Sequence, residues 1–268
     1  MQSLVLAKKQ ENCWISYIKQ RIRKNKNFLG FISGETGSGK SWSSLSVAEQ
    51  ADGRFTIEQC VFGAEELMLL INSKKLRKGS VIVFEEVGVE MSNKNWQSIT
   101  NKVVNYLLQT FRHRNFILIM NSPFMDFVDA TTRKLFHAEM RTVGINRTDK
   151  TCMLKPLLLQ YNSKKKKFYY KRLRVITQGG TRPVDSWSVP KPSPHLIEMY
   201  ELKKRNYTDE LNKRILSELQ AVSNPKGKKE REHKHNWLVR ITKNERYCRT
   251  CGYIEALSAQ NMVTNPLN

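Results

Sequence analysis

The feature that most constrains the fold of this chain is the segment Gly-Glu-Thr-Gly-Ser-Gly-Lys-Ser at residues 34–41. It matches the phosphate-binding loop pattern, in which glycines let backbone amides curl around a phosphate and a lysine and a hydroxyl follow at fixed spacing. An apolar run at residues 28–33 precedes the segment, and a helix-forming run follows it. This context of strand, loop and helix is the one that the pattern requires.

The loop residues have separate expected roles in binding ATP. Lys40 places a positive charge on the β- and γ-phosphate oxygens, while the hydroxyl of Ser41 is a ligand for Mg2+. The positive end of the following helix points at the phosphates. The loop residues that we expect to bind the nucleotide are Gly34, Glu35, Thr36, Gly37, Ser38, Gly39, Lys40 and Ser41.

A second motif, Val-Ile-Val-Phe-Glu-Glu at residues 81–86, places two acids directly after a buried strand. We expect Glu85 to hold Mg2+ through water and Glu86 to polarise the attacking water, because adjacent side chains at a strand end point to opposite sides. Glu85 stands where aspartate is usual in such strands. The alternative is a solvated strand end with two acids.

Two further polar groups flank the strand at residues 116–120. Asn121 follows its carboxyl end, where its side chain is expected to contact the γ-phosphate or the lytic water. Arg112 and Arg114 precede its amino end, and one of them is a candidate arginine finger for a neighbouring subunit's nucleotide. The alternative for either arginine is an ordinary surface position on a basic protein.

The alternation of apolar strands with helical periodicities predicts a doubly wound α/β core with a parallel sheet. We expect strands at residues 28–33, 55–61, 80–84 and 116–120 and helices at 64–72, 95–112 and near 131–135. Residues 151–176 predict an antiparallel hairpin with a basic turn at 164–167 that extends the sheet. A C-terminal helix at 196–219 and a small zinc-ribbon-like module complete the expected fold.

The predicted organisation has six parts. They are an N-terminal basic helix (1–27), a P-loop ATPase core with its hairpin extension (28–182), a proline-rich connector with the C-terminal helix (183–222), a charged linker (223–232), the zinc module (233–256) and a tail (257–268). The N-terminal helix is either a basic amphipathic surface helix or a cap on the core, and the sequence favours neither.

Together the loop, the acidic strand end, the long helix ending in Thr-Phe-Arg-His-Arg-Asn and the strand Ile-Leu-Ile-Met-Asn-Ser-Pro resemble the FtsK/HerA-related P-loop ATPases. The resemblance is strongest to zonular occludens toxin-like proteins and to archaeal or viral ATP-binding proteins of mobile elements, over about residues 28–160. It implies a RecA-like core, assembly into a homo-oligomeric ring, and ATP-driven movement of DNA in packaging, extrusion or conjugation. It also implies that the Asn121 strand lies between the strands of Lys40 and Glu85.

The net charge of +22 favours a polyanionic partner, either nucleic acid or an anionic membrane surface. Basic residues outnumber acidic ones in residues 161–250, which are expected to contact mainly the DNA backbone; the alternative is a solvated charged face. The sequence contains no transmembrane segment and no secretory signal. A cytoplasmic protein, virus- or plasmid-encoded, is the resulting expectation.

The C-terminal segment contains four side chains of the types that bind Zn2+. They are His233, His235, Cys248 and Cys251. Cys-x-x-Cys-Gly is a common zinc-binding turn, and so small a module would need the metal in order to fold. We expect a structural rather than a catalytic zinc, since four protein ligands leave no open position. The alternative is a basic tail with two cysteines by chance.

Three other function classes compete with a DNA-translocating motor. An ATP-dependent DNA-binding adaptor without strong hydrolysis would carry the same loop. A small-molecule phosphotransferase would need an arginine-rich lid and rarely has such a net charge. A GTPase would need an Asn-Lys-x-Asp motif at a strand end, whereas Asn101-Lys102-Val103-Val104 lacks the acid.

Overall fold

The computed structural model describes residues 4–6, 12–85, 114–177, 180–223 and 236–257. The chain divides into two compact units, residues 1–207 and 208–268, each of which is considered by itself. The helix expected at residues 95–112 lies outside the described residues. So do Glu86, Arg112, His233 and His235.

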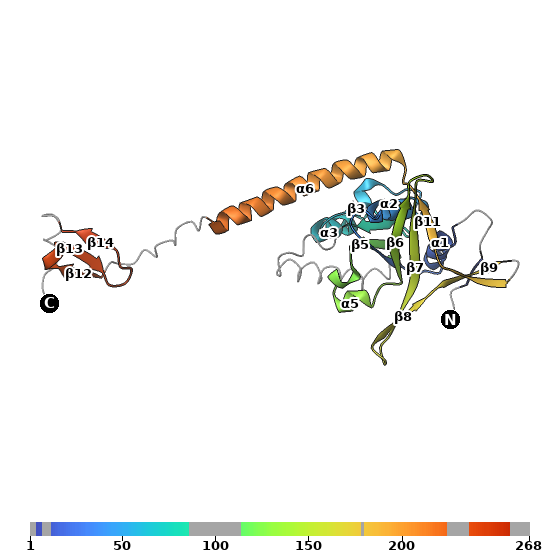
Figure 1. The fold of residues 1–268 in the computed structure, drawn as a ribbon, viewed down its shortest axis with the longest axis horizontal. Helices are drawn as coiled ribbons and strands as arrows, with labels where there is room; N and C mark the ends of the chain where they lie inside the picture. The colour runs from blue at the N-terminus through green and yellow to red at the C-terminus, as the bar shows by residue number, and fades with distance from the viewer. Residues whose placement is uncertain (1–3, 7–11, 86–113, 178–179, 224–235, 258–268) are drawn as a thin grey trace. The chain divides into compact units, whose positions relative to one another are not determined.

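The first unit contains most of the regular structure (Figure 1). Its helices are α1 (Cys13–Arg23), α2 (Lys40–Ala51), α3 (Ala64–Asn72), α5 (Ala130–Arg133) and the start of α6 (Pro194–Ser223). Its strands are β1 (Leu4–Leu6), β2 (Phe28–Ser33), β3 (Cys60–Val61), β4 (Val81–Phe84), β5 (Ile117–Asn121), β6 (Ala138–Asn146), β7 (Thr151–Asn162), β8 (Lys167–Lys171), β9 (Leu173–Thr177), β10 (Gly180–Val184) and β11 (Trp187–Pro190).

The central sheet has the order β11-β7-β6-β2-β5-β4-β3, and β8 also pairs with β7. Strands β3, β4, β5, β2 and β6 are parallel, whereas β7, β8 and β11 join antiparallel. The mixed α/β architecture with a mainly parallel sheet is therefore confirmed. Strand β5 lies between β2 and β4, so the carboxyl ends of these three strands meet at one edge, as the resemblance implied.

Four details of the strands differ from the sequence prediction. Residues 173–176, predicted as part of the hairpin that extends the sheet, lie in β9, which pairs with β1 and β10 in a separate three-stranded sheet. Strand β6 was not predicted, because Glu139 and Arg141 alternate with its buried residues and make it appear polar. Residues 187–190, predicted as connector, form β11 and pair with β7. The strand predicted at residues 55–61 is reduced to β3 at Cys60–Val61, because residues 57–59 form a turn of 3-10 helix.

Two apolar layers cover the two faces of this sheet. Because successive strand residues point to opposite faces, Phe28 and Ile32 enter one layer while Leu29 and Phe31 enter the other. Helices α1, α2 and the start of α6 pack in the first layer, and α3 packs in the second. The central strands are buried on both faces, which explains their nearly continuous apolar runs.

Helix α1 packs against the core. Asn12 caps its first turn by accepting from the backbone amide of Trp14, and its apolar side chains are buried. The indole of Trp14 stacks on that of Trp187 in β11, with ring centroids 6.1 Å apart. Of the two roles left open by the sequence, capping the core describes this helix.

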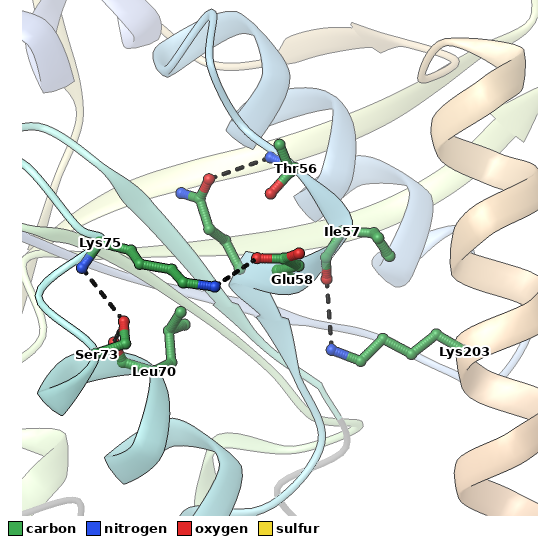
Figure 2. Close-up of polar contacts among 8 residues, drawn as sticks. Thr56, Ile57, Glu58, Leu70, Ser73, Lys75 and Lys203 are labelled. Atoms are coloured by element: carbon green, nitrogen blue, oxygen red, sulfur yellow. Dashed lines mark hydrogen bonds and ion pairs between the residues drawn. The ribbon is translucent and has the colours of Figure 1, made fainter.

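The start of α6 is fastened to the β3 edge of the sheet by Lys203. Its ammonium donates to the carbonyl of Ile57 at 3.4 Å, as Figure 2 shows, and to the carbonyl of Cys60 at 2.5 Å. It also pairs with the Glu66 carboxylate. These contacts fix one turn of the helix and thereby hold Tyr200, one turn earlier, against the core.

The second unit contains a small antiparallel sheet of β12 (Trp237–Arg240), β13 (Glu245–Cys248) and β14 (Ile254–Ala256). The Arg246 guanidinium lies 4.4 Å from the ring centroid of Trp237 and pairs with Glu255. Across the described parts of both units, every helix is too short or too polar to span a bilayer.

Candidate functional site

The phosphate-loop motif forms a tight turn between β2 and α2. Gly37 and Gly39 have φ angles of +78° and +93°, in the left-handed region that favours glycine. Helix α2 begins at Lys40 immediately after Gly39, so the amides of its first turn face the loop. A Cβ at Gly34 would lie 1.8 Å from Oγ1 of Thr142, so only glycine fits there.

Strand β6 braces the loop through Thr142. Its Oγ1 lies 2.6 Å from Oγ of Ser38, and it donates to the carbonyl of Ser33 at 3.2 Å. Within the loop, the Lys40 ammonium donates to the carbonyl of Glu35 at 2.7 Å. Thr142 was missed by sequence reasoning, because it lies in the strand that the sequence did not predict.

Glu85, directly after β4, is fully buried among hydrogen-bond donors. Its Oε2 accepts from the hydroxyl of Ser41 at 2.8 Å and from the hydroxyl of Tyr200 at 3.2 Å. Its Oε1 accepts from Ser44 at 3.2 Å and from the amide of Asn121. Three elements, α2, β5 and α6, thus place four donors around one carboxylate.

Burial raises the pKa of the Glu85 carboxyl, and the hydrogen bonds from Ser41, Asn121 and Ser44 and the charge of Lys204 oppose that rise. The pKa of Tyr200 is also raised, first by burial and then by the neighbouring Glu85 charge. Tyr200 therefore acts as a hydrogen-bond donor towards the carboxylate.

The donor set of Ser41 and Glu85 fits a divalent cation that prefers oxygen. A hydroxyl on the first turn after the loop lies 2.8 Å from a buried carboxylate oxygen, at the side where phosphates would bind. The buried carboxylate is surrounded by uncharged donors rather than by a paired cation in direct contact. The residues expected to hold Mg2+ are thus adjacent.

Asn121, predicted to contact the γ-phosphate or the lytic water, lies at the same edge and is hydrogen-bonded to neighbouring side chains. Its Nδ2 donates to Glu85 and, at 2.7 Å, to Ser44. Its Oδ1 is buried and accepts no hydrogen bond from the described residues. The side chain thus positions Glu85 and has one acceptor left for a donor entering the cleft.

A cleft of about 650 Å³ opens over this edge of the sheet. Its lining includes the loop residues Thr36, Gly37, Gly39, Lys40 and Ser41 together with Glu85 and Asn121. The start of α6 contributes Tyr200, Glu201 and Lys204 to the same lining. Sequence reasoning predicted α6 as a helix but gave Tyr200 no role, because nothing in the local sequence shows which helix covers the loop.

Of the two arginine-finger candidates, Arg114 belongs to the described residues, and it does not lie at this edge. Arg114 precedes β5, at the opposite end of the strand from Asn121, and its guanidinium donates to the carbonyl of Ile71 at 2.9 Å. Arg112 and the expected water-polarising Glu86 lie outside the described residues.

The C-terminal cysteines lie at a tight turn after β13. The amide of Gly252, which has a φ of +73°, donates to the carbonyl of Cys248 at 2.9 Å, and the amide of Thr250 points to the Cys248 sulfur at 3.4 Å. Cys248 is buried and Cys251 exposed. Within the described ranges no three His, Cys, Asp or Glu residues gather as a metal site, and both expected histidines lie outside those ranges.

No protein-family model and no curated protein matches this sequence. Among solved structures it is similar to a DNA polymerase III gamma subunit-related protein from Thermotoga maritima, at 11% identity and a TM-score of 0.38, with 50% of this chain and 47% of that one covered. It is also similar to the N-terminal domain of zonular occludens toxin from Neisseria meningitidis, at 13% identity and a TM-score of 0.31, covering 55% and 95%. This chain spans about half the length of the first structure. Both TM-scores are low, so function is argued from the residues of the chain itself.

Proposed function

We propose that the chain is an ATP-binding P-loop ATPase. The observation that carries this proposal is the 2.8 Å hydrogen bond between Ser41, the hydroxyl of the phosphate-loop motif, and the buried carboxylate of Glu85. A hydroxyl and a carboxylate in direct contact beside a glycine-rich loop suit Mg2+ with a bound triphosphate.

In this proposal, different residues bind the phosphates, bind the metal ion and activate the attacking water. The loop amides and Lys40 hold the phosphates, and Ser41 and Glu85 hold Mg2+, which neutralises developing phosphate charge when bound. Asn121 keeps Glu85 oriented and offers its Oδ1 to the lytic water or a bound ligand. Glu86, outside the described residues, polarises the attacking water.

We further propose that the ATPase moves DNA as a homo-oligomeric ring. Support comes from the net charge of +22 and from the exposed lysines at residues 164–167 in the turn between β7 and β8. Such a turn suits sequence-independent contacts with backbone phosphates. Arg112 or Arg114 would then reach a neighbouring subunit's nucleotide.

The second candidate is an ATP-dependent DNA-binding adaptor with little hydrolysis. The burial of Glu85 favours it, because burial raises the pKa of this carboxyl and so disfavours the charged form that binds a metal. Steady-state ATP hydrolysis with and without double-stranded DNA separates the two. Stimulation by DNA supports the motor, whereas ATP and DNA binding without turnover supports the adaptor.

DNA binding has its own test in salt dependence. Replacing Lys164–Lys167 with alanine should reduce the slope of log affinity against log salt by about 0.9 for each lost phosphate contact. The matched control replaces Lys74, Lys75 and Lys78, which are equally exposed in the turn after α3. Salt-insensitive binding, or an equal loss in both variants, would contradict a role for the hairpin.

A further inference from the structure

A second pocket, of about 200 Å³, adjoins the main cleft. Gly39, Trp42 and Ile145 line both, so the two hollows lie next to each other at the last glycine of the loop. Cys152, Val189 and Pro190 complete the apolar walls. The sequence did not indicate this pocket, because its walls come from α2, β6, β7 and β11.

The chemistry of the pocket suits a flat aromatic ring. The indole of Trp42 is 36% exposed, and the exposed side chain of Ile145 also belongs to the lining. Lys191 holds its ammonium 4.8 Å from the centroid of the Trp42 ring. This cation–π contact places a charged group over the indole ring beside the pocket.

The position of the second pocket relative to the loop indicates which end of a bound triphosphate it would face. Glu85 and Asn121 line the main cleft but not the second pocket, so the metal side and the second pocket lie on different sides of Gly39. A triphosphate with its γ end near Glu85 would direct its other end past Gly39 and Trp42.

Resting on the proposed ATP-binding function, we propose that the second pocket is the nucleobase site, in which the base stacks on Trp42 and packs against Ile145. The described charged residues that line it are Arg147, Lys150 and Lys191. These cations donate hydrogen bonds, so they match the ring-nitrogen acceptors of a base at the rim. The triphosphate is then bound by the loop and the base by a separate, largely apolar surface.

Calorimetry tests this proposal by measuring the affinity of the protein for two ligands. They are Mg2+–ATP and Mg2+–tripolyphosphate, which has no base. Trp42→Ala should lower the affinity for ATP about tenfold, which is a typical loss for one base–aromatic stack. The same change should leave the affinity for tripolyphosphate unchanged. Trp42→Phe should restore most of the ATP affinity because it keeps an aromatic face. Tyr169→Ala, which removes a comparably exposed ring on β8, is the matched control and should change neither affinity.

Two outcomes would overturn the base site, and a third would overturn the proposed ATP binding. Equal weakening of both ligands in Trp42→Ala would overturn the base site, because the residue would then act on the phosphates. Unchanged ATP affinity would overturn it as well. Failure of the unmodified protein to bind either ligand would overturn the proposed ATP function itself.

Discussion

The hydroxyl of Tyr200 donates a hydrogen bond to Oε2 of Glu85 across 3.2 Å, and so connects α6 to the acid that follows β4. The two residues are 115 positions apart in sequence, and both are almost completely buried. Oε2 is also the oxygen bonded to Ser41 of the phosphate loop. Under the proposed function, Tyr200 therefore positions the metal-holding carboxylate.

Tyr200→Phe should raise the Mg2+ concentration that gives half-maximal nucleotide hydrolysis by about tenfold. The hydroxyl stabilises the ionised carboxylate, and a hydrogen bond to a charged group contributes about 1.5–3 kcal/mol. Losing it raises the pKa of Glu85 further, so the acid limb of the activity profile should move to higher pH. Metal-free ATP affinity should stay the same.

The matched control for this change is Tyr17→Phe. Tyr17 is also buried, but its hydroxyl accepts from Arg21 on α1. Its removal should leave the Mg2+ requirement unchanged. An unaltered Mg2+ requirement and pH profile in Tyr200→Phe would show that Glu85 does not depend on this hydroxyl.

Thr142→Val should weaken nucleotide binding by about fivefold. The valine keeps the shape but removes the hydroxyl that contacts Ser38, and one neutral hydrogen bond contributes about 1 kcal/mol. Titration with Mg2+–ATP measures the loss. Thr132→Val, which removes a buried hydroxyl near Asp129 and away from the loop, should lower stability without lowering affinity; equal affinity losses would contradict bracing by Thr142.

His137 should make the protein less stable in acid. Burial, and then the charges of Arg21 and Lys26, lower its pKa from 6.5 to about 3, and its Nδ1 accepts from the amide of Leu29. Between these two pH values the unfolded chain binds a proton that the folded chain does not. Its contribution to stability is therefore complete above about pH 6.5 and is lost as the pH falls towards 3, by at most about 1.4 kcal/mol per pH unit.

Denaturant unfolding at several pH values measures this dependence. His137→Asn keeps an acceptor for Leu29 but cannot titrate, so its unfolding free energy should fall less steeply over the same window. Parallel curves for the two proteins would show that His137 is not buried in its neutral form.

The sequence prediction that the C-terminal module binds zinc requires about one zinc per chain by metal analysis. Cys248→Ser should remove it, because the thiolate is a proposed ligand, whereas Cys13→Ser on α1 should retain it. The first unit should remain folded in both variants. A full zinc content in Cys248→Ser would contradict the proposed ligand set.

The sequence predicted those parts of the site that lie in continuous motifs. The loop at residues 34–41, Glu85 and Asn121 each follow an apolar strand, and the structure places all three at one sheet edge. Local apolar runs identify such strands because both faces of a parallel sheet are buried.

The remaining contributions depend on tertiary structure. Thr142 reaches the loop from β6, which pairs with β2 but looks polar in sequence. Tyr200 reaches Glu85 because α6 packs against the core, where Lys203 and the ring contacts of Tyr200 and Tyr207 with Phe62 hold it. The walls of the second pocket come from three separate parts of the chain, namely α2, the β6–β7 hairpin and β11, so no local pattern could indicate them.

The central claim, that the loop at residues 34–41 binds ATP, is tested most directly by calorimetric titration of the protein with Mg2+–ATP. The unmodified chain should bind one ATP per subunit, Lys40→Ala should show no measurable binding, and Lys78→Ala, which removes a surface lysine bonded to Asn25, should bind normally. Equal affinity in Lys40→Ala and the unmodified chain, or no binding by either, would contradict the account.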